Sequence, residues 1–189
     1  MTSHPPETCA FAFKEWAGVC AALESGRQSV ILRKGGIEEG PGGFVPDHEA
    51  FWLYPTRVHQ TQQGLKHPDP PDEHTPEGKV RLRALAVVRR VERVESLETL
   101  QTLDDLHVWT AETVEARFRY RAPGLWVLGV RVYRTAQPFE IEVTPEHAGC
   151  KTWVPLDPPL STRGATLVLR DDAFRDELRR LDARLRQAP

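Results

Sequence analysis

An alternating run between Val80 and Val94 constrains the fold of this chain more than any other feature of its sequence. Apolar side chains occupy every second position at its start, and Arg81, Arg83 and Leu85 stand between them, as in V-R-L-R-A-L-A. Successive side chains of a strand point to opposite faces of a sheet, so this pattern of period two predicts one long strand. The chain must therefore build its fold around a sheet.

Other segments with helix or strand signals lie on both sides of this run. Apolar residues at helical spacing predict helices over residues 13–25, 97–106, 111–119 and 172–187, with Ser96 and Thr110 as N-caps of the second and third. Runs of β-branched, aromatic and aliphatic residues predict strands over 29–33, 51–54, 125–134, 139–143 and 165–170, with Pro55 ending the second. This order is not the regular alternation of a doubly wound parallel sheet, so it predicts an α+β fold. Short strands of mixed length favour a small mixed β-barrel with N-terminal and C-terminal helices.

The composition is that of a globular protein of one domain. The chain has 189 residues, 40% of them hydrophobic, and five tryptophans, which is enough apolar surface to bury a sizeable core. We therefore predict a single domain over residues 1–189. Residues 61–79 are rich in Gln, Pro, Asp and His and contain Leu65 as their only large aliphatic side chain, so they predict a mobile loop within that domain rather than a linker.

Charge and cysteine content exclude several classes of protein. The 25 Lys and Arg nearly balance the 27 Asp and Glu, which argues against a highly basic nucleic-acid tail protein and against an acidic disordered chaperone. The sequence contains no apolar run long enough to span a membrane and no signal peptide, so we predict no membrane association and a cytoplasmic location. Three cysteines without C-x-x-C spacing predict free thiols.

The densest polar cluster falls in the first 60 residues, where cationic and amide side chains alternate with aromatic rings. Rings stack on a base and donors bind its edges, so this mixture predicts a pocket for nucleic acid or a nucleotide-like ligand. In R-K-G-G the two glycines let backbone amides approach an anion, and the two cations before them would hold phosphate. The predicted ligand-binding residues are Lys14, Trp16, Arg33, Lys34, Gly35, Gly36, Tyr54, Thr56, His59 and Gln60.

A second basic stretch lies between Val80 and Arg134, where ten arginines face seven acidic residues. Its net charge of +3 is a faint footprint for a phosphate backbone, and a solvated protein surface explains it equally well. Arg117, Arg119, Arg121, Arg131 and Arg134 fall in this stretch.

Three other interpretations stay open. A metal-dependent enzyme acting on phosphodiester or nucleotide substrates would use Glu15, Glu39, His48, Glu49 and His59 as acid, base or metal-binding groups. No H-E-x-x-H motif supports this, so we predict no metal site, and we assign neither a cofactor nor a catalytic residue. Cys150 with His147 would fit a thiolate and its base, although G-C-K-T-W is more typical of a turn. The third is a module that docks on a larger nuclease.

Several blocks of the sequence, taken together, resemble an uncharacterised bacterial family known as domain of unknown function 1802. The blocks are A-F-K-E-W-A-x-V-C-x-A-L (12–23), I-L-R-K-G-G-I-x-E-G (31–40), F-W-L-Y-P-T-x-x-H-Q (51–60), G-V-R-V-Y-R (129–134) and A-G-C-K-T-W (148–153). The family has no assigned activity. Its link to restriction-type endonuclease domains in larger chains implies a role near DNA modification or defence, with a nuclease as partner.

A looser similarity links residues 21–33 and 124–134 to the PUA-like barrels of the ASCH and EVE groups, which bind RNA or modified DNA bases. It implies that the barrel is PUA-like and that DNA or RNA is the partner. The Gly/Pro segment 41–47 and the excursion 61–78 depart from that pattern.

Overall fold

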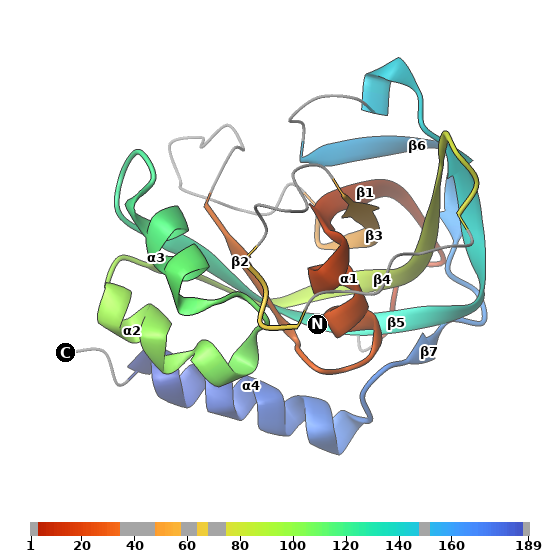
Figure 1. The fold of residues 1–189 in the computed structure, drawn as a ribbon. Coiled ribbons are helices and arrows are strands. Elements are labelled where there is room, and N and C mark those ends of the chain that lie inside the picture. Colours follow the sequence, from red (N-terminus) through yellow and green to blue (C-terminus); the bar gives the residue numbers. More distant parts are fainter. Residues whose placement is uncertain (1–3, 35–47, 58–63, 68–74, 148–151, 187–189) are drawn as a thin grey trace.

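The computed structural model describes residues 4–34, 48–57, 64–67, 75–147 and 152–186, and these form a mixed α+β fold (Figure 1). Its elements, in chain order, are β1 (Thr8–Trp16), α1 (Ala17–Glu24), β2 (Val30–Arg33), β3 (Ala50–Thr56), β4 (Lys79–Val94), α2 (Leu97–Thr102), the 3-10 turn η2 (Asp104–Leu106), α3 (Ala111–Arg119), β5 (Leu125–Glu142), the 3-10 turn η3 (Pro145–His147), β6 (Trp153–Ser161), β7 (Thr166–Leu167) and α4 (Asp171–Arg186). The predicted fold class is confirmed at this level.

The strands form one seven-stranded sheet in which six follow the order β2-β5-β4-β3-β1-β6. β1 and β3 run parallel, whereas the other neighbours along this path are antiparallel, and β7 pairs with β5 away from it. Within the described residues the path has two ends, β2 and β6, so the sheet is not closed. The predicted closure into a small barrel is not confirmed.

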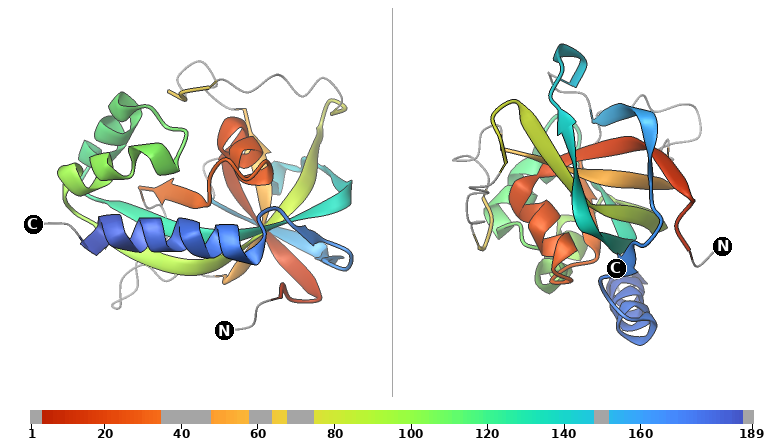
Figure 2. Two further views of the ribbon diagram at one scale, coloured as in Figure 1. Left: turned by 90° about the horizontal axis from the view of Figure 1, so that it is seen from below. Right: turned by 90° about the vertical axis from the view of Figure 1, so that its right-hand side faces the viewer.

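Two hydrophobic clusters lie on the two faces of this sheet, and β3 divides them. Phe51 and Leu53 point into the first cluster, while Trp52 and Tyr54 point into the second. All four described α-helices contribute side chains to the first cluster, and Figure 2 shows α4 alongside the long strand β5. The buried members of the second cluster come from strands alone. Side chains of one sheet can pack against each other in this way only if the sheet curls around them.

The first predicted helix is wrong in its N-terminal part. Residues 13–25 carry apolar side chains at helical spacing, but Phe13 to Trp16 form the end of β1 and the helix begins at Ala17. β1 pairs with β3 on one side and with β6 on the other. These pairings join residues far apart in sequence, so they override a local helical pattern.

Prolines mark three other differences from the sequence-based prediction. β3 continues through Pro55 because its pairing with β4 ends at Trp52, and Pro55 therefore has a neighbour on one side only. β6, which no sequence signal predicted, contains Pro155, Pro158 and Pro159 and lies at the edge of the sheet, where missing donors are tolerated. The two strands predicted on either side of Pro138 are one strand, β5.

The predicted loop over residues 61–79 contains a short anchored segment. Leu65 forms an isolated bridge with Trp109, and the amide of Lys66 donates to the carbonyl of Val108 at 2.8 Å. Residues 61–63 and 68–74 lie outside the described residues, and residue 79 already belongs to β4. The single large aliphatic side chain of the excursion is therefore the one that attaches it to the first core.

Two further predictions concern the cysteines and membrane-spanning segments. Cys9 is a free thiol, as predicted, and both Cys9 and Cys20 are buried. Cys150 lies outside the described residues. In the part of the chain that the structure describes, no helix combines the length and the apolar character needed to cross a membrane.

Candidate ligand-binding site at the strand ends

The parallel pairing of β1 and β3 brings most of the described predicted site residues together. In this register Lys14 is opposite Tyr54 and Trp16 is opposite Thr56. Arg33, the last residue of β2, joins them because its Nη1 donates to the carbonyl of Lys14 at 3.3 Å. We call Lys14, Glu15, Trp16, Arg33, Tyr54 and Thr56 the strand-end site.

Lys14 and Tyr54 form one half of the strand-end site. The Lys14 Nζ atom lies 5.9 Å from the centre of the Tyr54 ring and donates to the carbonyl of His147 in η3. The Tyr54 ring packs in the second cluster, and burial raises the pKa of its hydroxyl. In this half, the Lys14 ammonium therefore lies above the Tyr54 ring and is hydrogen-bonded to the backbone of η3.

Glu15 and Arg33 form the other half. Their closest approach is 3.5 Å, between Glu15 Oε2 and Arg33 Nη1, and the Glu15 side chain is only 3% exposed. The other carboxylate oxygen, Oε1, accepts from the amide of Trp16 at 2.8 Å. Oε2 itself has no hydrogen-bond partner among the described residues.

Arg33 holds three strands together from this position. Its Nη2 donates to Thr152 Oγ1 at 2.8 Å, just before β6, and its guanidinium lies 4.7 Å from the centre of the Phe13 ring. On the other side of Glu15, Thr56 Oγ1 donates to the Glu15 carbonyl at 3.1 Å. The ends of β1, β2 and β3 and the start of β6 are thus fixed around one buried ion pair.

The electrostatics of this pair are unbalanced towards positive charge. Burial raises the pKa of Glu15, and the charges of Arg33 and Arg117, with the Trp16 amide, oppose that rise. Burial lowers the pKa of Arg33, and the nearby charge of Arg117 lowers it further, against the opposite effect of Glu15. One carboxylate therefore faces two guanidinium groups.

Trp16 connects the strand ends to α3. Its ring lies 5.3 Å from that of Trp109, tilted by 38°, and is partly buried. The guanidinium of Arg117, an exposed residue of α3, lies 5.2 Å above the same ring. The sequence placed Arg117 in a basic stretch but gave no signal that it would meet Trp16, because the two are 101 residues apart.

Lys34 differs from the other predicted residues in where its charge is used. Its Nζ donates to the carbonyls of Phe118, Ala122 and Gly124, the first at 2.8 Å and the third at 3.0 Å. An ammonium has three donors, so these three bonds use all of them. Lys34 therefore holds the end of α3 and the turn after it, and we leave it out of the strand-end site.

The remaining predicted residues are dispersed or lie outside the described residues. Gly35, Gly36, His59, Gln60 and Glu39 belong to the segments that the structure leaves undescribed. His48 stacks on Phe11 at 3.5 Å between ring centres and meets Trp153 edge-on, and Glu49 is exposed. Among the described residues, no group of three His, Cys, Asp or Glu side chains could hold a metal ion.

Sequence reasoning also missed Thr152, which accepts from Arg33. The G-C-K-T-W block contains it, but the block reads as a turn rather than as the entry to an edge strand.

Comparison with known proteins gives one family match. The family model described as Domain of unknown function (DUF1802) matches residues 12–180. A search of curated proteins found no match. Among solved structures, the chain is similar to the ASCH protein of Zymomonas mobilis, with 15% identity over 92% of this chain and 93% of that one, and a TM-score of 0.45.

Two variants of that Zymomonas mobilis protein are also similar to this chain. The variant with Phe in place of a tyrosine has 12% identity, covers 89% of this chain and 96% of its own, and has a TM-score of 0.49. The variant with Ala in place of a serine has 14% identity, covers 93% and 98%, and has a TM-score of 0.45. Because these scores are below 0.5, no statement about function follows from them.

Proposed function

The chain belongs to the family described as domain of unknown function 1802, and from its strand-end site we propose that it binds nucleic acid or a nucleotide-like ligand there. The observation that carries the proposal is the excess of cations around Glu15. Arg33 and Arg117 both act on this one carboxylate. Lys14, the preceding residue of β1, adds a cation over the Tyr54 ring, on the other face of the strand. Like charges held close together repel, so an anionic ligand at this place would relieve the repulsion.

Aromatic side chains beside the cations support a ligand that also carries a base. Trp16 is partly buried and has a guanidinium above its ring, and Tyr54 has the ammonium of Lys14 nearby. Phosphate contacts position a nucleic acid, and accessible rings stack its bases. Tyr54 is only 5% exposed, so Trp16 is the ring for stacking. In this proposal Arg117 and Lys14 bind phosphate and Trp16 stacks. Arg33, whose donors contact Lys14 and Thr152, fixes the strand ends and supplies long-range positive charge.

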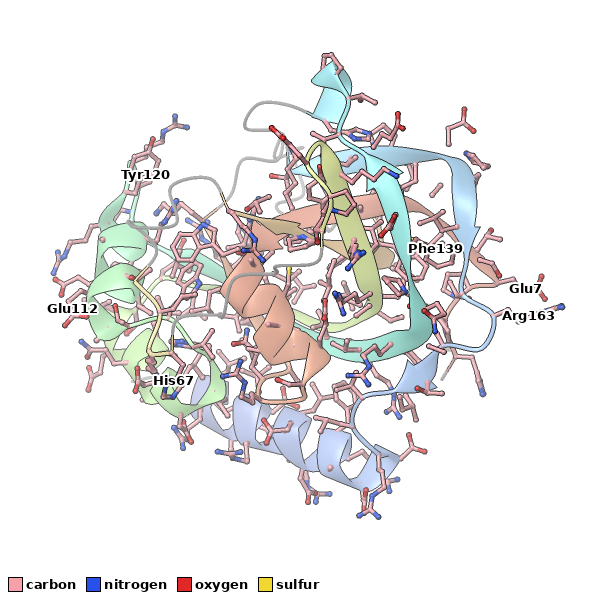
Figure 3. All side chains as sticks on the ribbon, turned by 45° about the vertical axis from the view of Figure 1, so that its right-hand side comes forward. Glu7, His67, Glu112, Tyr120, Phe139 and Arg163 are labelled. Atoms are coloured by element: carbon pink, nitrogen blue, oxygen red, sulfur yellow. The ribbon has the colours of Figure 1, made fainter. Side chains whose placement is uncertain are left out.

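Binding of labelled single-stranded RNA, single-stranded DNA and duplex DNA at two salt concentrations tests the proposal. Each phosphate contact adds about 0.7 to 0.9 to the slope of log affinity against log salt. We expect salt-sensitive binding by the natural chain and a slope reduced by about that amount in Arg117→Ala. The matched control is Arg163→Ala, because Arg163 is also exposed and Figure 3 shows it on the opposite side of the molecule from Tyr120, three residues after Arg117.

Two results would contradict the proposal. Absence of binding to all three nucleic acids at low salt would rule out the module for the isolated chain. Equal loss in Arg117→Ala and Arg163→Ala would show that any surface arginine contributes, and not the strand-end site. The same reactions, repeated with Mn²⁺ and examined on a denaturing gel, separate binding from chemistry: intact nucleic acid fits a binding module, and cleavage would favour the metal-dependent enzyme.

The finer expectations stay predictions. These are ligand contacts by Gly35, Gly36, His59 and Gln60, a PUA-like barrel form, a bacterial source, a cytoplasmic location, a nuclease partner and a role in DNA modification or defence.

A further inference from the structure

The turn between α3 and β5 presents an exposed tyrosine three residues after Arg117, the arginine above the Trp16 ring. Tyr120 is 52% exposed, the largest fraction among the exposed large hydrophobic residues that the structure describes. Figure 3 shows its side chain extending outward from the end of α3. A single exposed ring is common on protein surfaces and needs no explanation by itself. The turn that carries Tyr120, however, accepts hydrogen bonds from two cationic side chains, Lys34 and Arg93.

All three donors of the Lys34 ammonium form hydrogen bonds to carbonyls of this turn. The lysine follows β2, and its three bonds go to the carbonyls of Phe118, Ala122 and Gly124, on both sides of Tyr120. The turn also closes on itself, since the amide of Gly124 donates to the carbonyl of Phe118 at 3.2 Å. An ammonium that the sequence assigns to phosphate binding thus fixes the backbone around an exposed ring.

A second cation holds the turn from β4. Arg93 Nη2 donates to the carbonyl of Pro123 at 3.1 Å, and the Arg93 guanidinium fills the space where any side chain on Gly124 would lie. In the turn that Lys34 and Arg93 hold, Arg121 adopts a φ of 63°. Among the described residues, this is the one positive φ of a non-glycine residue. Such a conformation persists only where the surroundings impose it. The Arg121 guanidinium lies 5.1 Å above the Tyr120 ring.

Arg117 links this turn to Trp16. Tyr120 is the C-cap of α3, and its amide donates to the carbonyl of Arg117, three residues earlier, at 3.3 Å. Arg117 also covers the ring of Trp16. Among the described residues, neither Arg117 nor Arg121 has an acidic side chain within ion-pair distance. Two rings and two guanidinium groups therefore follow one another along this part of the chain.

We propose that Tyr120 and Arg121 form a second contact for single-stranded nucleic acid, in which an unpaired base stacks on the Tyr120 ring and a neighbouring phosphate binds Arg121. The inference rests on the proposed function and extends it from the strand-end site to this turn. A duplex keeps the faces of its bases covered, so it cannot use an exposed ring in this way. Arg121 above the ring and Arg117 three residues earlier in the chain favour a phosphate-bearing strand over an apolar protein surface. Lys34 is then a positioning residue for Tyr120.

The test compares Tyr120→Ala with Tyr120→Phe in binding to fluorescent oligouridine and oligothymidine of about ten nucleotides, a length typical of such sites. Stacking of one base changes affinity by roughly 5- to 150-fold on alanine substitution. We expect a loss in that range for Tyr120→Ala, natural affinity for Tyr120→Phe, and no change for duplex DNA. Leu167→Ala, at another exposed apolar residue, is the control and should bind as the natural chain does.

A further pair of variants tests the role of Lys34. Lys34→Met removes the three donors, and we expect it to weaken oligonucleotide binding. In the double variant with Tyr120→Ala, the loss should not exceed that of Tyr120→Ala alone, because both changes remove the same contact. Losses that add in full would overturn the positioning role, since Lys34 would then act on the ligand by itself.

Failure of this inference can be told from failure of the proposed function. If Arg117→Ala loses salt-sensitive binding while Tyr120→Ala binds as the natural chain does, the strand-end site stands and the second contact is overturned. If Tyr120→Phe is as weak as Tyr120→Ala, or if duplex binding falls equally, stacking of an unpaired base is overturned. Absence of oligonucleotide binding by the natural chain would overturn both. The RNA and DNA probes show which sugar the contact accepts.

Discussion

Removal of the positive charge of Arg33 is expected to destabilise the fold by leaving Glu15 buried without a counter-ion. The Glu15 side chain is 3% exposed, and its Oε2 has Arg33 Nη1 at 3.5 Å and no hydrogen bond among the described residues. Arg33→Met retains an unbranched apolar side chain beside Phe13 but has neither charge nor donors. The substitution therefore removes the ion pair and the two hydrogen bonds of Arg33 but keeps an apolar side chain at this position.

The expected magnitude follows from these contacts. Removal of one partner of a buried ion pair costs about 3 to 5 kcal/mol. Each lost hydrogen bond, to the Lys14 carbonyl and to Thr152 Oγ1, adds about 1 kcal/mol. Arg33 is 21% exposed, so water partly screens its charge and the ion-pair contribution falls at the low end. We expect a total of about 5 kcal/mol and, at about 2 to 4 °C per kcal/mol for a chain of this size, a Tm lower by roughly 10 to 20 °C.

This loss should depend on pH in a definite direction. Burial raises the pKa of Glu15, and the charge of Arg33 opposes the rise, so in Arg33→Met the pKa is higher still. An acid with a raised pKa in the folded state contributes stability that is complete below its unfolded pKa, about 4.3 for Glu, and that is lost as pH rises through the folded pKa. The difference in unfolding free energy between variant and natural chain should be smaller near pH 5 than near pH 8.

Urea unfolding, followed by tryptophan fluorescence at both pH values, measures this difference. The double variant Arg33→Met with Glu15→Gln should recover part of the stability near pH 8, because no charge is then buried without a partner. Equal destabilisation at both pH values, with no recovery in the double variant, would refute the reasoning. The loss would then come from packing and hydrogen bonds rather than from the Glu15 charge.

Two other predictions concern the region around α2 and α3. Burial, with the nearby charge of Lys66, lowers the pKa of His107 from 6.5 to about 4, so the neutral ring is favoured by roughly 3 kcal/mol. A group with a depressed pKa contributes stability that is present above its unfolded-state pKa and is lost as pH falls through its folded-state pKa. Thermal melts between pH 7 and about pH 4 should show this loss of stability. In His107→Leu, the loss of stability over the same pH range should be smaller. Gly64→Ala would place a Cβ against Thr113 Oγ1, so it should detach residues 64–67 from α3. Hydrogen exchange at the Thr110 amide, which donates to the Gly64 carbonyl at 2.9 Å, should then speed up, and unchanged exchange would contradict the anchoring.

Local sequence signals correctly predicted two helices and one strand, α2, α3 and β4. Thr110 was predicted to cap a helix over 111–119, and its side chain accepts from the amide of Thr113 at the start of α3, which has those bounds. Ser96 caps α2 in the same way, at the amide of Thr99. Strand β4 follows the alternation of its own residues. Capping and alternation act over a few residues, so the sequence carries this information where the element forms.

The site required the tertiary structure. The sequence singled out Lys14, Trp16, Arg33 and Tyr54 by residue type, but their grouping depends on the parallel pairing of β1 with β3, and the N-terminal part of 13–25 was predicted as helix. The use of Lys34 also had no local signal, because its acceptors lie 84 to 90 residues away. Strand pairing and charge–carbonyl contacts at such separations are selected by the packing of the whole chain, which no segment determines alone.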